Sequence, residues 1–177
     1  MYIGDYLGRR TIYSPDALAI VDTGKNPELR LTYAQLNERA NRLANWLRAT
    51  AGIGKGDRVA ILAQDRVEHL DSLFACGKLG AVHTALNWRL HWRELQQILA
   101  SVTPTVLLYD DAFKDAVTQL AERETPLRHW IHLDGEGIPG SLEFGALLAA
   151  APTTPCVCES LEGEDIATIL FTGGTTG

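Results

Sequence analysis

Short apolar runs alternate with longer amphipathic stretches along most of this chain, and no other feature constrains the fold as strongly. The runs have the length and β-branched content of strands buried on both faces. Between them, apolar residues recur at spacings of three and four, as in amphipathic helices. Strands that alternate with helices predict right-handed crossovers and a mostly parallel sheet. We therefore expect an α/β fold, a three-layer sandwich with helices on both faces of one sheet, whose strands are residues 59–63, 82–86, 105–109, 130–133 and 166–171.

The first 50 residues follow a different pattern, and we expect them to form an opening segment with a hairpin and a helix. Residues Leu18–Asp22 and Leu29–Thr32 flank the turn-rich sequence TGKNPE, which predicts the hairpin. Thr32 and Gln35 have the spacing of a capping box, so a helix should begin there. Residues 51–177 would then form the sheet, with helices near 67–79, 91–101, 113–123 and 141–150.

Composition and charge exclude several classes of protein. Hydrophobic residues make up 46% of the 177 residues and charged residues 21%, which is typical of a soluble globular domain. The formal net charge is −6 and lysines and arginines do not cluster, so we expect no nucleic-acid partner. The chain has no apolar run of transmembrane length, and its start, MYIGDYLGRR, does not resemble a signal peptide. These features indicate a cytoplasmic protein without a transmembrane segment.

Cysteines and histidines do not follow the spacing of a metal site. Cys76 lies in a helical apolar pattern and is expected to be a small buried hydrophobe. Cys156 and Cys158 match neither zinc-site nor redox-pair spacing and are expected to be exposed thiols in a linker. His129 and His132 should point to opposite faces of a strand. We therefore predict no metal ligand.

Two glycine-rich loops are candidates for binding phosphate. The segment GEGIPG, residues 135–140, matches a dinucleotide-binding pattern, but Asp134, Glu136 and Pro139 would oppose a pyrophosphate. We expect a surface turn there, leading to a helix capped by Ser141. The second candidate, TGGTTG, has no acid and offers backbone N–H groups and hydroxyls, which suits a polyphosphate. On composition alone, a plain turn leaving a sheet is equally acceptable. Its residues are Thr172, Gly173, Gly174, Thr175, Thr176 and Gly177.

The segment ILFTGGTTG resembles the glycine- and threonine-rich loop of the adenylate-forming (AMP-binding) superfamily, in particular the acyl-CoA synthetases. Phe171 and the loop residues agree with that motif except Gly173, which replaces the usual serine, and the x-Pro-Lys-Gly continuation is absent. The run LNWRL at residues 86–90 is similar to fatty-acyl and related ligases. Further segments similar to this superfamily are residues 31–48, 52–65, 77–90 and 94–110.

This resemblance implies the amino-terminal part of a longer ATP-dependent acid–thiol ligase. Such enzymes adenylate a carboxylic acid and pass the acyl group to coenzyme A, with ATP and Mg²⁺ as further requirements. Residues 172–177 would bind the phosphates of ATP, and no catalytic residue is assigned within the chain. An adenylation domain that feeds a carrier protein and a small non-enzymatic α/β binding protein are the alternatives. The resemblance also implies uncovered apolar surface around residues 1–50, and hence self-association.

Overall fold

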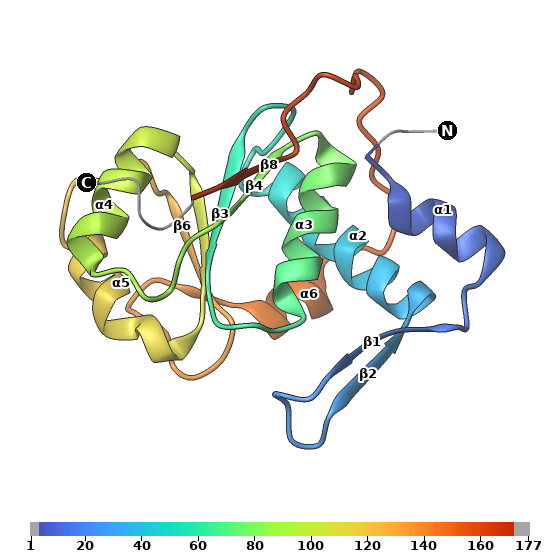
Figure 1. Ribbon diagram of the computed structural model, residues 1–177, viewed down its shortest axis with the longest axis horizontal. Coiled ribbons are helices and arrows are strands. Elements are labelled where there is room, and N and C mark those ends of the chain that lie inside the picture. Colours follow the sequence, from blue (N-terminus) through green and yellow to red (C-terminus); the bar gives the residue numbers. More distant parts are fainter. Residues whose placement is uncertain (1–3, 172–177) are drawn as a thin grey trace.

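The computed structural model describes residues 4–171, which form one sheet with helices on both faces and a separate hairpin (Figure 1). The expected α/β sandwich is confirmed. The helices are α1 (Tyr6–Tyr13), α2 (Tyr33–Ala49), α3 (Glu68–Leu79), α4 (Trp92–Val102), α5 (Lys114–Ala121) and α6 (Phe144–Ala150), with a short 3₁₀ turn at Asp111–Phe113. The strands are β1 (Leu18–Asp22), β2 (Leu29–Thr32), β3 (Arg58–Leu62), β4 (Val82–Ala85), β5 (Val106–Tyr109), β6 (His129–His132), β7 (Leu142–Glu143) and β8 (Thr168–Leu170).

Within the described residues, the main sheet has the strand order β7-β6-β5-β3-β4-β8, and every neighbouring pair is parallel. The five expected strands are all present in it, with ends shifted by a few residues. β3 lies centrally, with β5 on one side and β4 on the other. Consequently the chain steps outward in one direction to β4, crosses to β5, and finally returns to β8 beside β4.

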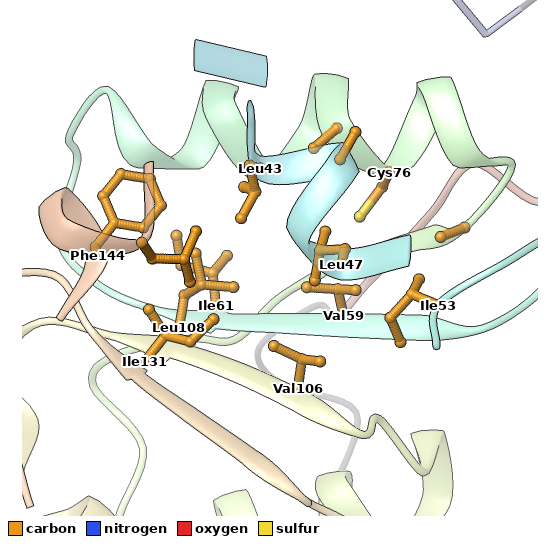
Figure 2. Close-up of a cluster of buried hydrophobic side chains, with 14 of the residues drawn as sticks. Leu43, Leu47, Ile53, Val59, Ile61, Cys76, Val106, Leu108, Ile131 and Phe144 are labelled. Carbon is orange, nitrogen blue, oxygen red and sulfur yellow. The ribbon is translucent and has the colours of Figure 1, made fainter. Parts of the chain in front are cut away.

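The two faces of the sheet carry separate cores because successive side chains on a strand point in opposite directions. Val59 and Ile61 of β3 pack against Leu43 and Leu47 of α2 on one face, and Phe144 of α6 joins them (Figure 2). On the other face, Ala60 and Leu62 pack against α4 and α5 through Leu95, Leu99, Val117 and Leu120. The alternation that predicted the sheet thus reflects burial on both sides.

The opening segment has the predicted local structure. β1 and β2 pair antiparallel. Thr32 and Gln35 form the predicted capping box at the start of α2, where the Thr32 hydroxyl accepts from the Gln35 N–H and the Gln35 side chain accepts from the Thr32 N–H. α1 is joined to α3 by an ion pair between Asp5 and Lys78, whose side chain is buried.

The prediction that Ser141 caps a helix is wrong. Residues 142–143 form β7, in which Leu142 pairs with Ile131 of β6, and α6 begins only at Phe144. Glu143 is the N-cap, and its carboxylate accepts from the backbone N–H groups of the first turn. The Ser141 hydroxyl instead donates to the Ile138 carbonyl at 2.7 Å. Pairing with β6 therefore delays the start of the helix by one short strand.

The prediction for Cys76 is confirmed and the prediction for Cys156 is wrong. Cys76 is buried in the core beneath α2, as expected. The prediction of an exposed linker thiol is wrong for Cys156, which is buried in the same core and donates its thiol hydrogen to Asn45 Oδ1 at 3.1 Å. His129 contacts Trp46 on one face of the sheet and His132 contacts Tyr109 on the other, which confirms their opposite orientations. Among residues 4–171, no group of histidines, cysteines and acids is placed to hold a metal ion.

Candidate functional site

The carboxyl ends of the parallel strands all lie along one side of the sheet, and we call this side the carboxyl edge. Ligands bind there in folds of this kind. β8 reaches that edge beside β4, because Leu170 pairs with Ala85. Phe171 follows, and the candidate phosphate-binding residues Thr172–Gly177 come next in the sequence but lie outside the described residues. The structure thus shows where the candidate loop begins, and its assignment to phosphate binding stays a prediction.

The connection that follows β4, residues 86–93, is rich in arginine and tryptophan and contains no acid. The Arg89 guanidinium lies 4.1 Å from the centre of the Trp88 ring. Trp92 is contacted by two guanidinium groups, that of Arg123 at 4.0 Å and that of Arg93 at 5.1 Å. Both tryptophans are half-buried, and Trp88 packs against the core under α4 and α5, so packing explains their positions. The arginines therefore give the segment that follows β4 a positive charge, which Glu94 partly offsets through its bond to the His91 N–H at 2.9 Å.

Acidic residues follow β3, β5 and β6 at the same edge, and Arg66 lies at their centre. Its guanidinium contacts Glu68 at 2.7 Å, Asp110 at 3.1 Å and Asp134 at 2.9 Å. Arg66 and Glu68 are almost fully buried, whereas Asp134 is half exposed. Lys25, from the hairpin turn, adds a contact of 3.2 Å to Glu68. The cluster therefore joins the ends of three strands and the hairpin.

The pKa shifts in this cluster show how its charges compensate. Burial opposes the charge of Arg66, but hydrogen bonds and charges from Glu68 and Asp134 outweigh it and raise the pKa of Arg66. Burial also disfavours ionisation of Glu68 and Asp134. Hydrogen bonds and charge from Arg66, together with the Asp111 N–H on Asp134, still leave the pKa of each carboxyl lowered. Arg66, Glu68 and Asp134 are therefore ionised near neutral pH.

A hollow of about 540 Å³ opens between the hairpin turn and the start of α3, with His69, Leu70 and Ala85 among its walls. The carboxylate of Asp22 lies at its margin but is occupied by the backbone. Its Oδ1 accepts from the Gly24 N–H at 2.9 Å and its Oδ2 accepts from the Val67 N–H at 3.0 Å. Asp22 therefore fixes the hairpin turn to the start of α3 and is not a free acid.

Beneath α3, a buried histidine interacts with a buried serine. His83 Nδ1 of β4 lies 3.2 Å from the Ser72 hydroxyl, and the His69 ring is 6.4 Å away. Burial, together with the nearby His69, lowers the pKa of His83 to about 4, so the ring is neutral near pH 7. The pair joins Ser72 of α3 to His83 of β4 and therefore stabilises the packing of the helix on the strand.

Sequence reasoning missed the Arg66 cluster, although a signal for it exists. Asp110 and Asp134 each follow closely after a predicted strand, and the carboxyl ends of parallel strands converge. Two acids brought together in this way favour a shared cation. Arg66 directly follows Asp65 and was available for that role.

A family model described as AMP-binding enzyme matches residues 9–177. The chain belongs to this family. Among curated relatives, a feruloyl-CoA synthase of an Amycolatopsis species is 37% identical and is matched over 99% of this chain and 31% of its own length. A long-chain-fatty-acid–CoA ligase of Mycobacterium tuberculosis is 36% identical, over 99% of this chain and 33% of that protein. The chain thus spans about a third of the length of these AMP-binding relatives.

Solved structures agree with this membership. The N-terminal domain of FACL13 from Mycobacterium tuberculosis superimposes with a TM-score of 0.86 at 33% identity, over 99% of this chain and 42% of that chain. The anthranilate-CoA ligase AuaEII gives a TM-score of 0.90 at 26% identity, over 100% of this chain and 33% of that one. The α/β sandwich described above is therefore the fold found in the amino-terminal regions of CoA ligases.

Proposed function

We propose that this chain is the amino-terminal part of an ATP-dependent acid–thiol ligase, which adenylates a carboxylic acid and transfers the acyl group to coenzyme A. The observation that carries the proposal is the position of the TGGTTG segment. In the sequence it comes after Phe171, one residue beyond β8, whose last residue Leu170 pairs with Ala85 of β4, and the chain belongs to the AMP-binding family. The curated relatives are named for different acids, among them ferulate, indoleacetate and long-chain fatty acids. They share the coenzyme A product, and the acid used here is left open.

In this proposal, residues 172–177 surround the β- and γ-phosphates of ATP. Backbone N–H groups and the hydroxyls of Thr172, Thr175 and Thr176 are donors suited to phosphate oxygens, and no acid competes within the segment. They stabilise the charge that grows on the departing pyrophosphate while the carboxylate attacks the α-phosphorus. Arg89 and Arg93, on the neighbouring connection, add positive potential. No described residue is assigned to Mg²⁺ or to coenzyme A.

A glycine-to-serine pair of variants tests the role of the loop in the longer protein. Gly173→Ser restores the hydroxyl that the motif usually carries, and we expect a lower KM for ATP in pyrophosphate exchange. Gly163→Ser is the matched control, because a Cβ at Gly163 meets no atom within 4 Å. Thr175→Val should raise the KM for ATP about tenfold through the loss of one bond to a charged phosphate. An unchanged KM in both loop variants would contradict phosphate binding by this segment.

We expect residues 1–177 alone to be inactive. Ordering the six loop residues costs about 1–2 kcal/mol each in backbone entropy. Each hydrogen bond to phosphate returns about 1.5–3 kcal/mol, and without the rest of a nucleotide site few such bonds form. Calorimetric titration of the 177-residue chain with MgATP tests this expectation. Micromolar binding would show a self-sufficient nucleotide site and contradict it.

The two alternatives are separated by direct experiments. If the acyl acceptor is a carrier protein, the longer protein will exchange pyrophosphate with ATP but will form no acyl-CoA. If the chain is a small binding protein, the coding sequence will not continue into the x-Pro-Lys-Gly motif. We also propose a cytoplasmic location, which the three free cysteines fit because reduced thiols are typical of that compartment. No helix among residues 4–171 has the length and apolarity needed to cross a bilayer.

Self-association of the 177-residue chain is a further proposal. Large apolar side chains are exposed on α1, where Tyr6 is 64%, Ile12 76% and Tyr13 71% accessible. Ile166 and Leu170, at the β8 edge of the sheet, are similarly exposed, at 63% and 68%. Contiguous exposed apolar surface favours association. Light scattering should show an oligomer, and a strict monomer at high concentration would contradict the proposal.

A further inference from the structure

A long irregular connector leads from one side of the main sheet, where β7 is the outermost strand, to the other side, where β8 is the outermost strand. After α6 the chain runs from residue 151 to residue 167 without a helix or strand, and we call this segment the strap. It begins after α6, the helix that follows β7, and ends at β8. β7 and β8 are separated by five strand spacings, or about 24 Å. In Figure 1 it leaves α6, passes α2 and returns over the molecule to β8. A connector this long without secondary structure needs other partners for its backbone.

Polar side chains on one face of α2 supply those partners for residues 151–157, and Lys55 holds the part nearer β8 through the Ser160 carbonyl at 2.6 Å and Asp165 at 2.8 Å. Asn45 Nδ2 donates to the Pro152 carbonyl at 2.9 Å and to the Thr154 carbonyl at 2.8 Å. Its Oδ1 accepts the Cys156 thiol hydrogen at 3.1 Å. Both ends of one amide are therefore used on the strap, which pins residues 152–156 in a single position.

Neighbouring residues of α2 extend this pattern in both directions. Arg42 donates to the Leu148 and Ala151 carbonyls at 3.0 and 2.8 Å, at the end of α6. Asn41 donates to the Thr153 carbonyl at 3.1 Å, and Arg48 donates to the Val157 carbonyl at 3.1 Å. These donors lie within two helical turns on α2, and together they bind the carbonyls of residues 151–154 and 157. Asn45 is at the centre of the series.

We infer that Asn45 is a positioning residue: by fixing the strap on α2 it sets how β8 pairs with β4, and thereby where the segment Thr172–Gly177 begins. β8 is short and is the outermost strand of the sheet; it pairs with β4 through residues 168–170, and the His83 N–H of β4 also donates to the Ala167 carbonyl at 3.0 Å. Because few contacts of its own stabilise so short a strand, its position depends on the chain that leads to it. The effect of Asn45 on the strap and on β8 does not depend on any enzymatic activity. Its effect on ATP binding rests on the proposed function.

Cys156 and Cys76 provide an internal measurement of strap opening. Both thiols are buried in the same core, but Cys156 lies on the strap and Cys76 lies on α3. In the 177-residue chain, Asn45→Ala should speed alkylation of Cys156 by about tenfold and leave Cys76 unchanged, because each lost hydrogen bond changes a local opening equilibrium by about five- to tenfold. Hydrogen exchange at Ile169, whose N–H faces β4 in this register, should rise by a similar factor, while Ile61 and Leu108 stay protected.

Matched variants separate this role from a general loss of stability. Arg58→Ala removes bonds to the Val102 and Thr103 carbonyls, the same chemistry at a site away from the strap, and should leave the ratio of Cys156 to Cys76 labelling unchanged. Asn45→Gln keeps the amide and should restore part of the protection. Asn45→Asp keeps the acceptor but loses the donors, and it serves if Asn45→Ala does not fold.

Two outcomes would overturn the inference. If Asn45→Ala raises labelling of Cys156 and Cys76 equally, or leaves exchange at β8 unchanged, Asn45 does not position the strap. In the longer protein, Asn45→Ala should raise the KM for ATP more than the KM for the carboxylic acid. An unchanged KM for ATP despite faster exchange at β8 would overturn the link from the strap to ATP. If the proposed function itself is wrong, the wild-type longer protein will show no pyrophosphate exchange. If only the link from the strap to ATP is wrong, the wild-type protein will show exchange and Asn45→Ala will leave the KM for ATP unchanged.

Discussion

Replacing Arg66 with methionine should destabilise the protein at neutral pH by about 3 kcal/mol. The variant leaves Glu68 buried without its nearest cation, and it also removes the contacts to Asp110 and Asp134. Losing one partner of a buried ion pair costs about 3–5 kcal/mol. The lower end applies here because Asp134 is half exposed and regains water, and because Lys25 still contacts Glu68.

The cost of Arg66→Met should shrink as the pH falls. In the wild-type protein the pKa values of Glu68 and Asp134 are lowered below their usual 4.5 and 3.8. A lowered pKa gives stability that is present above the unfolded-state value and is lost as the pH falls through the folded-state value. In the variant this contribution is missing, and burial instead favours protonated Glu68. The difference in unfolding free energy should therefore be largest above about pH 6 and smaller near pH 4.

Urea unfolding followed by tryptophan fluorescence measures both quantities. The matched control is Arg30→Met, because the Arg30–Glu28 pair is exposed and such pairs contribute about 0–1 kcal/mol. A second variant, Arg66→Met with Glu68→Gln, should recover part of the loss, since it removes the buried charge. A change below 1 kcal/mol in Arg66→Met, or a cost independent of pH, would refute the view that these charges hold the strand ends together.

Three further substitutions test other parts of the structure. Leu47→Ala should lower the unfolding free energy by about 3 kcal/mol in urea, because Leu47 is fully buried between α2 and β3; a cost below 1 kcal/mol would contradict that packing. As the pH falls from about 6.5 to about 4, the wild-type protein should lose about 3 kcal/mol of unfolding free energy, because His83 takes up a proton in the unfolded chain and not in the folded one. His83→Gln should abolish this loss, and parallel pH profiles of the two proteins would contradict the expectation. Lys78→Met should release α1, because Asp5 loses its ion pair, and limited proteolysis should then cut within residues 6–13 faster than in the wild type. Unchanged cleavage would show that α1 is held by other contacts.

The sheet was predictable because its strands are buried on both faces. Runs such as VAILA at 59–63 are continuous and apolar for that reason, and the helices between them show a regular spacing. The Thr32–Gln35 capping box was equally readable, because its partners are three residues apart and need no tertiary contact. Strand order was not readable, since nothing local states that β8 returns to pair with β4.

The errors concern residues whose partners are distant in sequence. Ser141 has the chemistry of a helix cap, but pairing of Leu142 with Ile131 moves the N-cap to Glu143. Cys156 lies in a segment with linker composition, yet Asn45, far earlier in the chain, binds it and buries it. Local patterns carry no information on such contacts. The candidate loop at residues 172–177 was read from a motif, and its role stays a prediction.

The distribution of charge along the sheet edge bears on where a nucleotide can bind. In sheets of this kind, ligands commonly lie where the direction of strand addition reverses, which here is between β3 and β5. That position is filled by Arg66 with its carboxylates, so the cation is already neutralised and a polyphosphate would meet Asp110 and Asp134. The segment after β4 carries Arg89 and Arg93, with Glu94 as the acid next to them, and β8 ends beside β4. Because a polyphosphate is repelled by carboxylates and attracted by cations, we expect a phosphate ligand at the end of β8 rather than at the reversal point.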